Sequence, residues 1–328
     1  MKILYSVQAT GNGHISRAHQ LYPYLCTLGQ VDILLSGSNA TLQMDIPIKF
    51  RAQGMSLFYS ECGGLDYIKT FKAFSYSRIK REAQDLPVRN YDLIINDFDH
   101  ITARACKIYG VPSVQFGHQA SFMSNITPRP NSKSIMGEAI LKYYAPATHY
   151  VGLHFERYDQ FIFPAVIKDT FLQCKPSDQG HITVYLPSYD KICLEEILRE
   201  VAPLDIHWFT KEITEPFRDG NIHYFPVSQQ YFNESLIHCH GLLTGGGFET
   251  PAEALYLGKK LLTIPIKGQY EQACNAAALE KMGVLKMNML NQNTKQTFFD
   301  WLKSSNKSPK IEANDINETL EFLLNMTM

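Results

Sequence analysis

The sequence predicts an α/β protein of two Rossmann-like halves, each with a parallel β-sheet. Short apolar runs rich in β-forming residues alternate with longer mixed segments, which is typical of βαβ units. This pattern restarts near Ile182, and 328 residues suit two domains of about 150 residues each. The eight expected strands are 3–7, 31–36, 93–96 and 113–116 in the first half, and 182–186, 206–209, 242–244 and 261–264 in the second.

The border between the halves is expected between residues 155 and 175, in a stretch punctuated by Pro164 and Pro176. We therefore predict an N-terminal domain of residues 1–160 and a C-terminal domain of residues 161–310. Residues 311–328 include a helix-like segment that can pack back on the N-terminal domain.

Composition excludes several classes of protein. With 45% hydrophobic and 19% charged residues, the chain has the composition of an ordinary globular protein. A net charge of -1 gives no general attraction to nucleic acid, so no nucleic-acid partner is expected. The seven cysteines contain no CxxC pair, which argues against a disulfide framework and a zinc site. The chain starts without signal-peptide features and no apolar run reaches about 18 residues, which predicts a cytoplasmic protein.

A glycine-rich turn in the second half suits an anionic ligand. Gly245, Gly246 and Gly247 follow an expected strand, and their missing Cβ atoms let backbone N–H groups approach a ligand. Thr250 suits the N-cap of the next helix and Pro251 its first position. Free N–H groups and the positive end of that helix dipole suit a diphosphate. A tight turn without a ligand is the alternative for the glycines alone.

Three polar residues downstream extend this pattern. Glu253 lies one turn into the helix, where its carboxylate can accept hydrogen bonds from both hydroxyls of a ribose. Glu271 and Gln272 follow the last expected strand, at the sheet edge where open α/β sheets bind ligands, and suit sugar hydroxyls. Each of these residues taken singly is also typical of a solvated helix surface.

The run GGGFETPAEALYLGKKLLTIPIKGQYEQACNAAALEKMG, which begins at Gly245, resembles the donor-site signature of GT-B glycosyltransferases. This group includes plant UDP-glycosyltransferases and the GlcNAc transferase of peptidoglycan synthesis. The resemblance implies a GT-B fold, an acceptor-side N-terminal domain and a C-terminal domain that binds a nucleotide sugar, UDP-linked, with no cofactor. It assigns the diphosphate to Gly245, Gly246, Gly247 and Thr250, the ribose to Glu253, and the transferred sugar to Glu271 and Gln272. The base of the nucleotide is expected near Phe225 and Val227.

One departure from the family pattern concerns charge. Some relatives carry a histidine or an arginine in the phosphate loop, whereas this chain has Phe248 and Glu249 after the glycines. Backbone dipoles would then meet most of the phosphate charge, with Lys211 or Ser188 as further candidates from other loops.

A second glycine loop follows the first expected strand. Gly11, Asn12, Gly13 and His14 open a helix, and the absence of a third glycine with the spacing of GxGxxG disfavours a nicotinamide enzyme. A histidine at the start of a helix beneath a cleft can accept the proton of an attacking hydroxyl, although a structural histidine is the alternative. Bacterial and archaeal members of the same clan open with a GxGH loop, and this resemblance would cover the whole chain.

The resemblance implies a mechanism. Many inverting GT-B enzymes use a histidine on the first loop as general base, which assigns that role to His14. The acceptor hydroxyl would lose its proton to His14 and attack the anomeric carbon, with inversion and without a metal. Certain relatives use an aspartate elsewhere.

Two further segments carry polar residues at strand ends. Asp97 and Asp99 form a DxD pattern, which binds a metal and the donor in another glycosyltransferase fold. Because the C-terminal run matches at many more positions, we interpret both aspartates as strand-end residues near the cleft that can contact the acceptor. His118 is a further acceptor-side candidate, and a structural role is the alternative.

Residues 67–81 interleave basic and aromatic side chains. They can rest on an anionic membrane that holds a lipid-linked acceptor, at the inner face of the membrane. An amphipathic helix that covers the sheet is the favoured interpretation.

The leading hypothesis is transfer of a hexose or N-acetylhexosamine from a UDP-linked sugar to a hydroxyl of a glycan, a lipid-linked glycan or a small molecule. A non-hydrolysing UDP-sugar 2-epimerase is the alternative with the same fold. A non-catalytic protein that binds nucleotide sugars is the alternative from another class.

Overall fold

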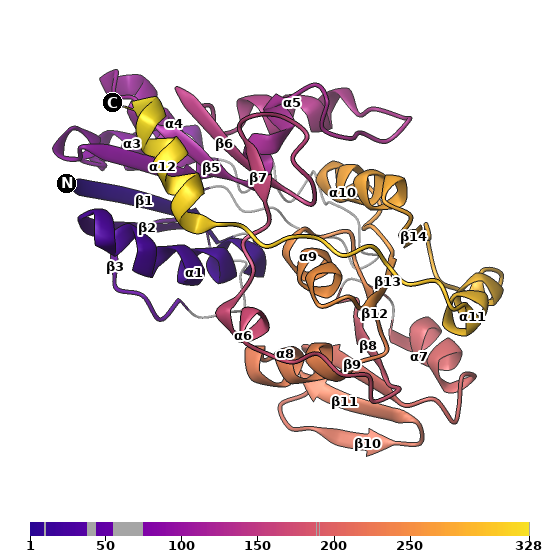
Figure 1. Ribbon diagram of the computed structural model, residues 1–328. Helices are drawn as coiled ribbons and strands as arrows, with labels where there is room; N and C mark the ends of the chain where they lie inside the picture. The colour runs from indigo at the N-terminus through magenta and orange to yellow at the C-terminus, as the bar shows by residue number, and fades with distance from the viewer. Residues whose placement is uncertain (10, 38–43, 55–74, 188, 190, 328) are drawn as a thin grey trace.

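The computed structural model describes residues 1–9, 11–37, 44–54, 75–187, 189 and 191–327. Within them the chain forms two sheets of seven strands each, one from residues 2–164 and the other from residues 182–286 (Figure 1). All strand pairs are parallel except β10 with β11. The α/β fold with two parallel-sheet halves is therefore confirmed.

The first sheet has the strand order β3-β2-β1-β4-β5-β6-β7. The order reverses between β1 and β4, and open α/β sheets bind ligands beyond the carboxyl ends of the strands at such a reversal. The segments that leave β1 and β4 therefore border the first half's ligand site. The strands are β1 (Lys2–Gln8), β2 (Gln30–Ser36), β3 (Ile48–Ala52), β4 (Leu93–Asp97), β5 (Val114–Gly117), β6 (His149–His154) and β7 (Ile162–Pro164).

Helices pack on both faces of the first sheet. Tyr5 of β1 lies in one hydrophobic cluster with Leu21 of α1, whereas the adjacent Leu4 lies in another with Ile79 of α3. Successive side chains of a strand point to opposite faces, so α1 and α3 cover opposite sides. The helices of this half are α1 (Asn12–Leu28), α3 (Tyr76–Asp85), α4 (His100–Tyr109) and α5 (Ile135–Tyr143), with 3-10 turns η1 (Val88–Asn90) and η2 (His118–Met123).

The second sheet has the order β10-β11-β9-β8-β12-β13-β14, with its reversal between β8 and β12. The glycine-rich turn leaves β12 at this reversal. The strands are β8 (Ile182–Tyr185), β9 (Ile206–Thr210), β10 (Phe217–Asp219), β11 (Ile222–Pro226), β12 (Gly241–Thr244), β13 (Lys260–Thr263) and β14 (Leu285–Lys286). The helices that follow the first sheet in the chain are α6 (Asp169–Leu172), α7 (Lys191–Arg199), α8 (Gln229–His238), α9 (Glu249–Tyr256), α10 (Tyr270–Lys281), α11 (Lys295–Lys303) and α12 (Ile316–Thr327).

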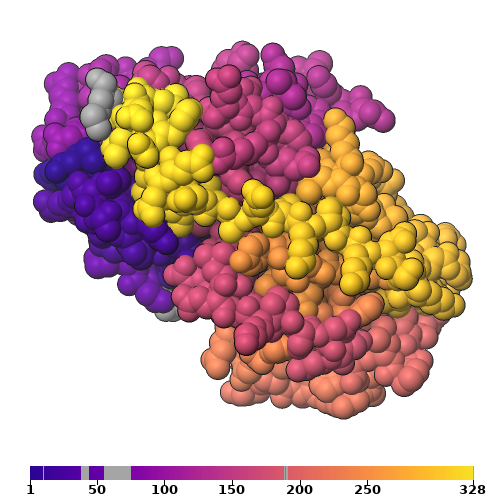
Figure 2. Space-filling model, in the orientation of Figure 1, coloured from indigo at the N-terminus to yellow at the C-terminus, as the bar shows by residue number. Residues whose placement is uncertain are grey.

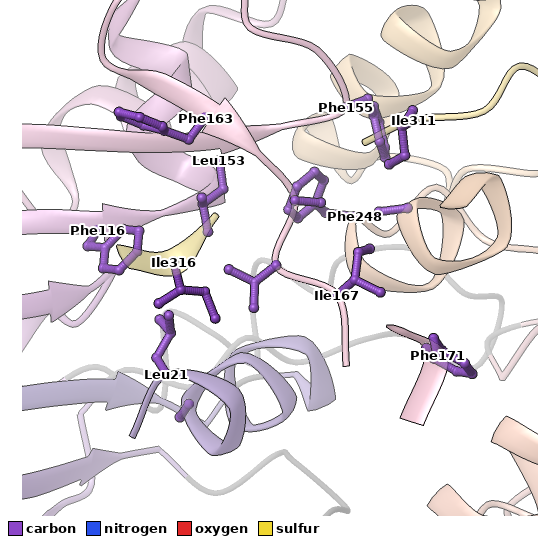
Figure 3. Packing of buried hydrophobic residues seen from close by; sticks show 14 of the residues in the cluster. Leu21, Phe116, Leu153, Phe155, Phe163, Ile167, Phe171, Phe248, Ile311 and Ile316 are labelled. Carbon is purple, nitrogen blue, oxygen red and sulfur yellow. The ribbon is translucent and has the colours of Figure 1, made fainter. Parts of the chain in front are cut away.

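The two halves share one hydrophobic cluster. Phe248, which precedes α9, packs against Phe155 of the first half with ring centroids 5.1 Å apart. Ile167, from the segment that joins the sheets, belongs to the same cluster (Figure 3). This shared packing fixes the start of α9 against the first half.

The end of the chain returns to the first half. After α11 the chain crosses the second half, and α12 lies on the first (Figures 1 and 2). Asn314 donates its backbone N–H to the carbonyl of Ala165 at 2.9 Å, and Glu318 pairs with Arg157 at 2.8 Å. Leu323 is fully buried in the cluster that contains α1. The last helix therefore contributes to the core of the first half.

We expect Leu323→Ala to lower the free energy of unfolding by about 2–5 kcal/mol, because it removes a buried side chain and leaves a cavity. Urea unfolding followed by circular dichroism measures the change. Asn325→Ala, at an exposed position of the same helix, is the control. Equal stability of the two variants would contradict a core role for α12.

Candidate active site

The two predicted glycine loops lie against each other. A Cβ built on Gly13 would lie 3.1 Å from Cγ of Glu249, the first residue of α9. Between the loops is a cavity of about 80 Å³. Asn12, Gly13, Thr250, Glu253 and Val227, all predicted site residues, are among those that line it. The fold therefore brings the N-terminal loop and the glycine-rich segment to one site.

His14, on the first turn of α1, pairs with the residue that ends β4. Its Nδ1 lies 2.9 Å from Oδ1 of Asp97, whose side chain is fully buried. Burial would raise the pKa of Asp97, but Arg17 and then His14 hold that pKa below its usual value. The ionised carboxylate only accepts hydrogen bonds, whereas Nη2 of Arg17, 3.1 Å from the same nitrogen, only donates. We place the ring proton on Nδ1 because the contact with Asp97, at 2.9 Å, is the shorter of the two. The lone pair of Nε2 then remains available to accept a proton.

Asp97 therefore differs from the sequence interpretation. We interpreted it as a strand-end residue that can contact the acceptor, but its carboxylate is bound by His14 and by Arg17, whose Nη2 donates to Oδ1 at 2.7 Å. No signal in the sequence joined these residues, which lie 80 and 83 positions away from Asp97. The parallel pairing of β1 with β4 brings them together.

Asp99, the second aspartate interpreted as a strand-end residue near the cleft, has a backbone partner. Its side chain accepts a hydrogen bond from the N–H of Thr102 at 2.7 Å and so caps α4. Asp99 is 1% exposed. The two aspartates of the DxD pattern thus have separate partners.

His118, for which an acceptor-side role and a structural role were both open, has protein partners at both ring nitrogens. This residue is buried, with Nδ1 2.9 Å from the carbonyl of Leu153 and Nε2 2.7 Å from Oδ1 of Asn275. Its ring stacks on Phe248 with centroids 4.0 Å apart. Burial lowers its pKa, and the two acceptor oxygens at its nitrogens oppose that shift. His118 therefore joins the two halves, which suits the structural alternative.

The glycine-rich segment is held by α10. The N–H of Gly246 donates to Oε1 of Gln272 at 3.1 Å, and its carbonyl accepts from Nδ2 of Asn275 at 3.0 Å. A Cβ on Gly246 would lie 2.8 Å from the carbonyl oxygen of Gln272, so only glycine fits there. A second cavity of about 120 Å³ is lined by Gly245, Gly247, Thr250 and Gln272 among others. Thr250 borders both cavities.

The predicted N-cap is wrong. The helix begins at Glu249, so Thr250 is its second residue, and Phe248 takes the cap position without a side-chain hydrogen bond. The helix therefore starts two residues earlier than predicted, and its cap residue Phe248 stacks on His118.

Glu271 and Gln272 lie at the start of α10 but already have protein partners. Oε1 of Gln272 also accepts from the N–H of Ile266 at 2.9 Å. Glu271 accepts from Nε2 of Gln119, a residue of the first half, at 3.1 Å. A sugar at this position would meet side chains that the protein has oriented in advance.

Glu253 is buried beside a cation that the sequence analysis missed. Nζ of Lys168 lies 2.9 Å from its Oε1, and both residues line the smaller cavity. Burial raises the pKa of Glu253, and Lys168 opposes that shift. Lys168 comes from the segment that joins the two sheets, where no motif marked it.

The remaining predicted contacts lie apart from the cavity or outside the described residues. Phe225 and Val227 were predicted to lie near the base of the nucleotide. Val227 lines the smaller cavity, whereas Phe225 is not among the described residues that line it and stacks on Phe209 with ring centroids 5.2 Å apart. Lys211 is exposed after β9, and Ser188 lies outside the described residues. A larger hollow of about 520 Å³ near Gly110 lies at the amino end of β5, away from both loops.

Only part of segment 67–81 falls within the described residues, from residue 75 on. There, α3 buries Ile79 in the cluster that contains Ile94 of β4. This packing suits a helix that covers the sheet. Among the residues that the structure describes, no helix is both long and apolar enough to cross a membrane.

Arg17 and Glu249 connect the halves at the site. Nη1 of Arg17, on α1, donates to Oε1 of Glu249, while Oε2 of Glu249 is buried without a hydrogen-bond partner in the described structure. Burial raises the pKa of Glu249 to about 7, and the opposing effect of Arg17 is smaller. Asp97 and Glu249 keep the pKa of Arg17 above its ordinary value in spite of burial.

Comparisons with known proteins identify the fold and the family. A family model described as glycosyl transferase family 1 matches residues 1–303. Arabidopsis thaliana UGT89C1 complexed with UDP is similar in structure, with a TM-score of 0.57, 12% identity and 100% of both chains covered. LpCGTa in complex with UDP has a TM-score of 0.62 and 12% identity, and Acinetobacter baumannii MurG has 0.55 and 12%, each with 99% of both chains covered. No curated protein matches the sequence. These neighbours have the GT-B fold that the resemblance implied.

The raised pKa of Glu249 predicts a pH dependence of stability. Its pKa rises from 4.5 to about 7 on folding, so the unfolded chain loses this proton first as pH increases. The stabilisation is complete below pH 4.5 and is lost as pH rises through about 7. Relative to Glu249→Gln, the wild type should therefore lose stability between these values.

Urea titrations at several pH values measure this difference. Glu318→Gln, which alters an exposed Arg–Glu pair, is the control, and its difference from wild type should not show this slope. Parallel curves for wild type and Glu249→Gln would contradict the prediction.

Proposed function

The chain belongs to glycosyl transferase family 1, and we propose that it transfers a hexose or N-acetylhexosamine from a UDP-linked sugar to an acceptor hydroxyl. Membership of this family makes the protein a glycosyltransferase. The observation that carries the finer proposal is the cavity between the two glycine loops. It joins Glu253 and the start of α9 to the loop that carries His14.

The donor would lie across the start of α9. Backbone N–H groups at the start of a helix favour an anionic diphosphate, and Gly247 has open space where its Cβ would be. Glu253 would accept hydrogen bonds from the ribose hydroxyls, with the base on the side of Val227. The two structural neighbours described as UDP complexes support a uridine nucleotide.

The proposed reaction is a single displacement with inversion. Nε2 of His14 takes the proton of the acceptor hydroxyl, whose oxygen forms a bond to the anomeric carbon as the bond to the diphosphate breaks. Asp97 stabilises the imidazolium that results, because its buried carboxylate faces Nδ1. The leaving diphosphate carries the bonding electron pair toward the start of α9, where the helix dipole is positive. This scheme assigns no step to a metal.

The acceptor stays open among a glycan, a lipid-linked glycan and a small molecule. Membrane contact through residues 67–81 also stays a prediction, as does a cytoplasmic location. A panel of these acceptor classes, tested with several UDP-sugars by release of UDP, distinguishes among them.

We expect UDP to raise the melting temperature, because a ligand that binds only the folded state stabilises it. Glu253→Ala should weaken UDP binding about tenfold or more, since it removes hydrogen bonds to a charged group. Calorimetric titration measures the affinity. Glu253→Gln keeps the shape of the side chain and tests the same contact if loss of the partner of Lys168 unfolds the alanine variant.

Glu280→Ala, which removes a Glu–Lys pair outside both cavities, is the control for these variants. Equal UDP affinity in wild type, control and both Glu253 variants would remove Glu253 from the ribose site.

His14→Ala should slow sugar transfer about 10²–10⁴-fold, the usual contribution of a general base, while UDP binding changes less than about twofold. Initial rates of UDP release at saturating donor measure the first quantity and calorimetric titration the second. Transfer at the wild-type rate in the variant would contradict the assignment of His14 as the general base. UDP binding with no transfer by the wild type to any acceptor would favour the non-catalytic alternative.

A further inference from the structure

The glycine-rich segment presents an acidic side chain where the donor diphosphate is expected. Glu249 is the first residue of α9, and residues 245–256, which comprise the glycines and this helix, contain neither a lysine nor an arginine. Glu253, one turn further on, adds a second carboxylate and raises the pKa of Glu249. Helix dipoles alone would have to offset these charges before a diphosphate could bind. A cation from another element is therefore required.

Arg17 has the geometry for that cation. Its Nε and Nη2 donate to Asp97, which fixes the guanidinium from one side. Nη1, on the other side, donates to Glu249 across the contact between the halves. The Arg17 side chain is only 3% exposed, so its charge is little screened by water.

Glu249 separates Arg17 from the cavity. Glu249 lines the cavity together with Gly13 and Thr250, whereas Arg17, its partner, is not among the described residues that line it. The second carboxylate oxygen of Glu249 is buried without a partner in the described structure. An anionic group of the protein thus fills the position between the arginine and the cavity.

We propose that Glu249 takes the place of a donor phosphate oxygen in the ligand-free enzyme, and that Arg17 binds the diphosphate once the donor displaces Glu249. This inference rests on the proposed donor site. Guanidinium binds carboxylate and phosphate oxygens by the same hydrogen-bond geometry, so the exchange preserves the contacts of Arg17. The chain thereby obtains the phosphate cation that its glycine-rich segment lacks.

The electrostatics of the site favour this exchange. Burial brings the pKa of Glu249 to about 7, so the side chain is only partly ionised near neutral pH and competes less strongly for Arg17 than a fully ionised carboxylate. Asp97 stays ionised and keeps the guanidinium in position when Glu249 leaves. Lys168 contributes less to the diphosphate, because it is paired with Glu253.

Calorimetric titration with UDP and with uridine separates the contact to the diphosphate from the contact to the nucleoside. Glu249→Gln should bind UDP about tenfold tighter than wild type, because a neutral amide competes less for Arg17, and should bind uridine with unchanged affinity. Glu318→Gln, the same change in the Arg157 pair, should bind both like wild type. Equal or weaker UDP binding by Glu249→Gln would overturn the proposal.

Arg17→Lys tests the cation itself and keeps a charge beside Asp97. We expect about tenfold to hundredfold weaker UDP binding with unchanged uridine binding, since the single ammonium nitrogen of lysine lacks the fork by which arginine binds Asp97 on one side and a phosphate on the other. Equal weakening of both ligands would show that Arg17 acts through the fold and would overturn its role at the diphosphate.

Failure of the donor site itself gives a different result. If wild type prefers GDP or dTDP to UDP, the proposal that the donor carries uracil is wrong, and the comparison is repeated with the preferred nucleotide and its nucleoside. If wild type binds none of these diphosphates, both the donor site and this inference are contradicted.

Discussion

The guanidinium of Arg17 holds the site together, because it binds the carboxylates of Asp97 and Glu249 at once. One carboxylate ends β4 of the first sheet and the other begins α9 of the second half. A buried arginine is tolerated only when its charge is paired and its hydrogen bonds are satisfied. Loss of Arg17 would leave Asp97 as an uncompensated buried anion and would disturb the partner of His14. The position of the candidate base and the contact between the halves therefore depend on the same side chain.

The sequence predicted the central strands because they are buried on both faces. β1, β4 and β12 each contain a short apolar run and are buried at almost every position, as expected for parallel strands covered by helices. The missed strands lack that signal. β3 alternates between half-buried and exposed positions and β10 is exposed throughout, since both lie at sheet edges. β6 is a buried strand, but its histidines and Gly152, which packs against η2, interrupt the apolar pattern.

The loops of the site were predictable, but their side-chain partners were not. In both halves, glycines that follow a strand and open a helix indicate a place where the backbone can come close to a ligand. The pairing of Arg17 with Glu249 joins residues 232 positions apart, and it depends on how the two sheets face each other. Asp99 and His118 show that a strand-end position alone does not decide a polar residue's partner. Polar residues at strand ends suit ligands, yet a free helix N–H bound one and Asn275 with a backbone carbonyl bound the other.

The first turns of α9 carry the buried Glu253 and the half-buried Glu249, and each is paired with a cation from outside that helix. Arg17 of α1 binds Glu249, and Lys168 of the segment between the sheets binds Glu253. A shift of the first half away from α9 would separate Arg17 from Glu249 and leave charges with fewer partners. Ribose hydroxyls are neutral and can share Glu253 with Lys168 without a change in charge. A diphosphate is anionic and competes directly with Glu249 for Arg17. The phosphate end of a donor would therefore change the charge balance between the halves, whereas its nucleoside end would leave that balance unchanged.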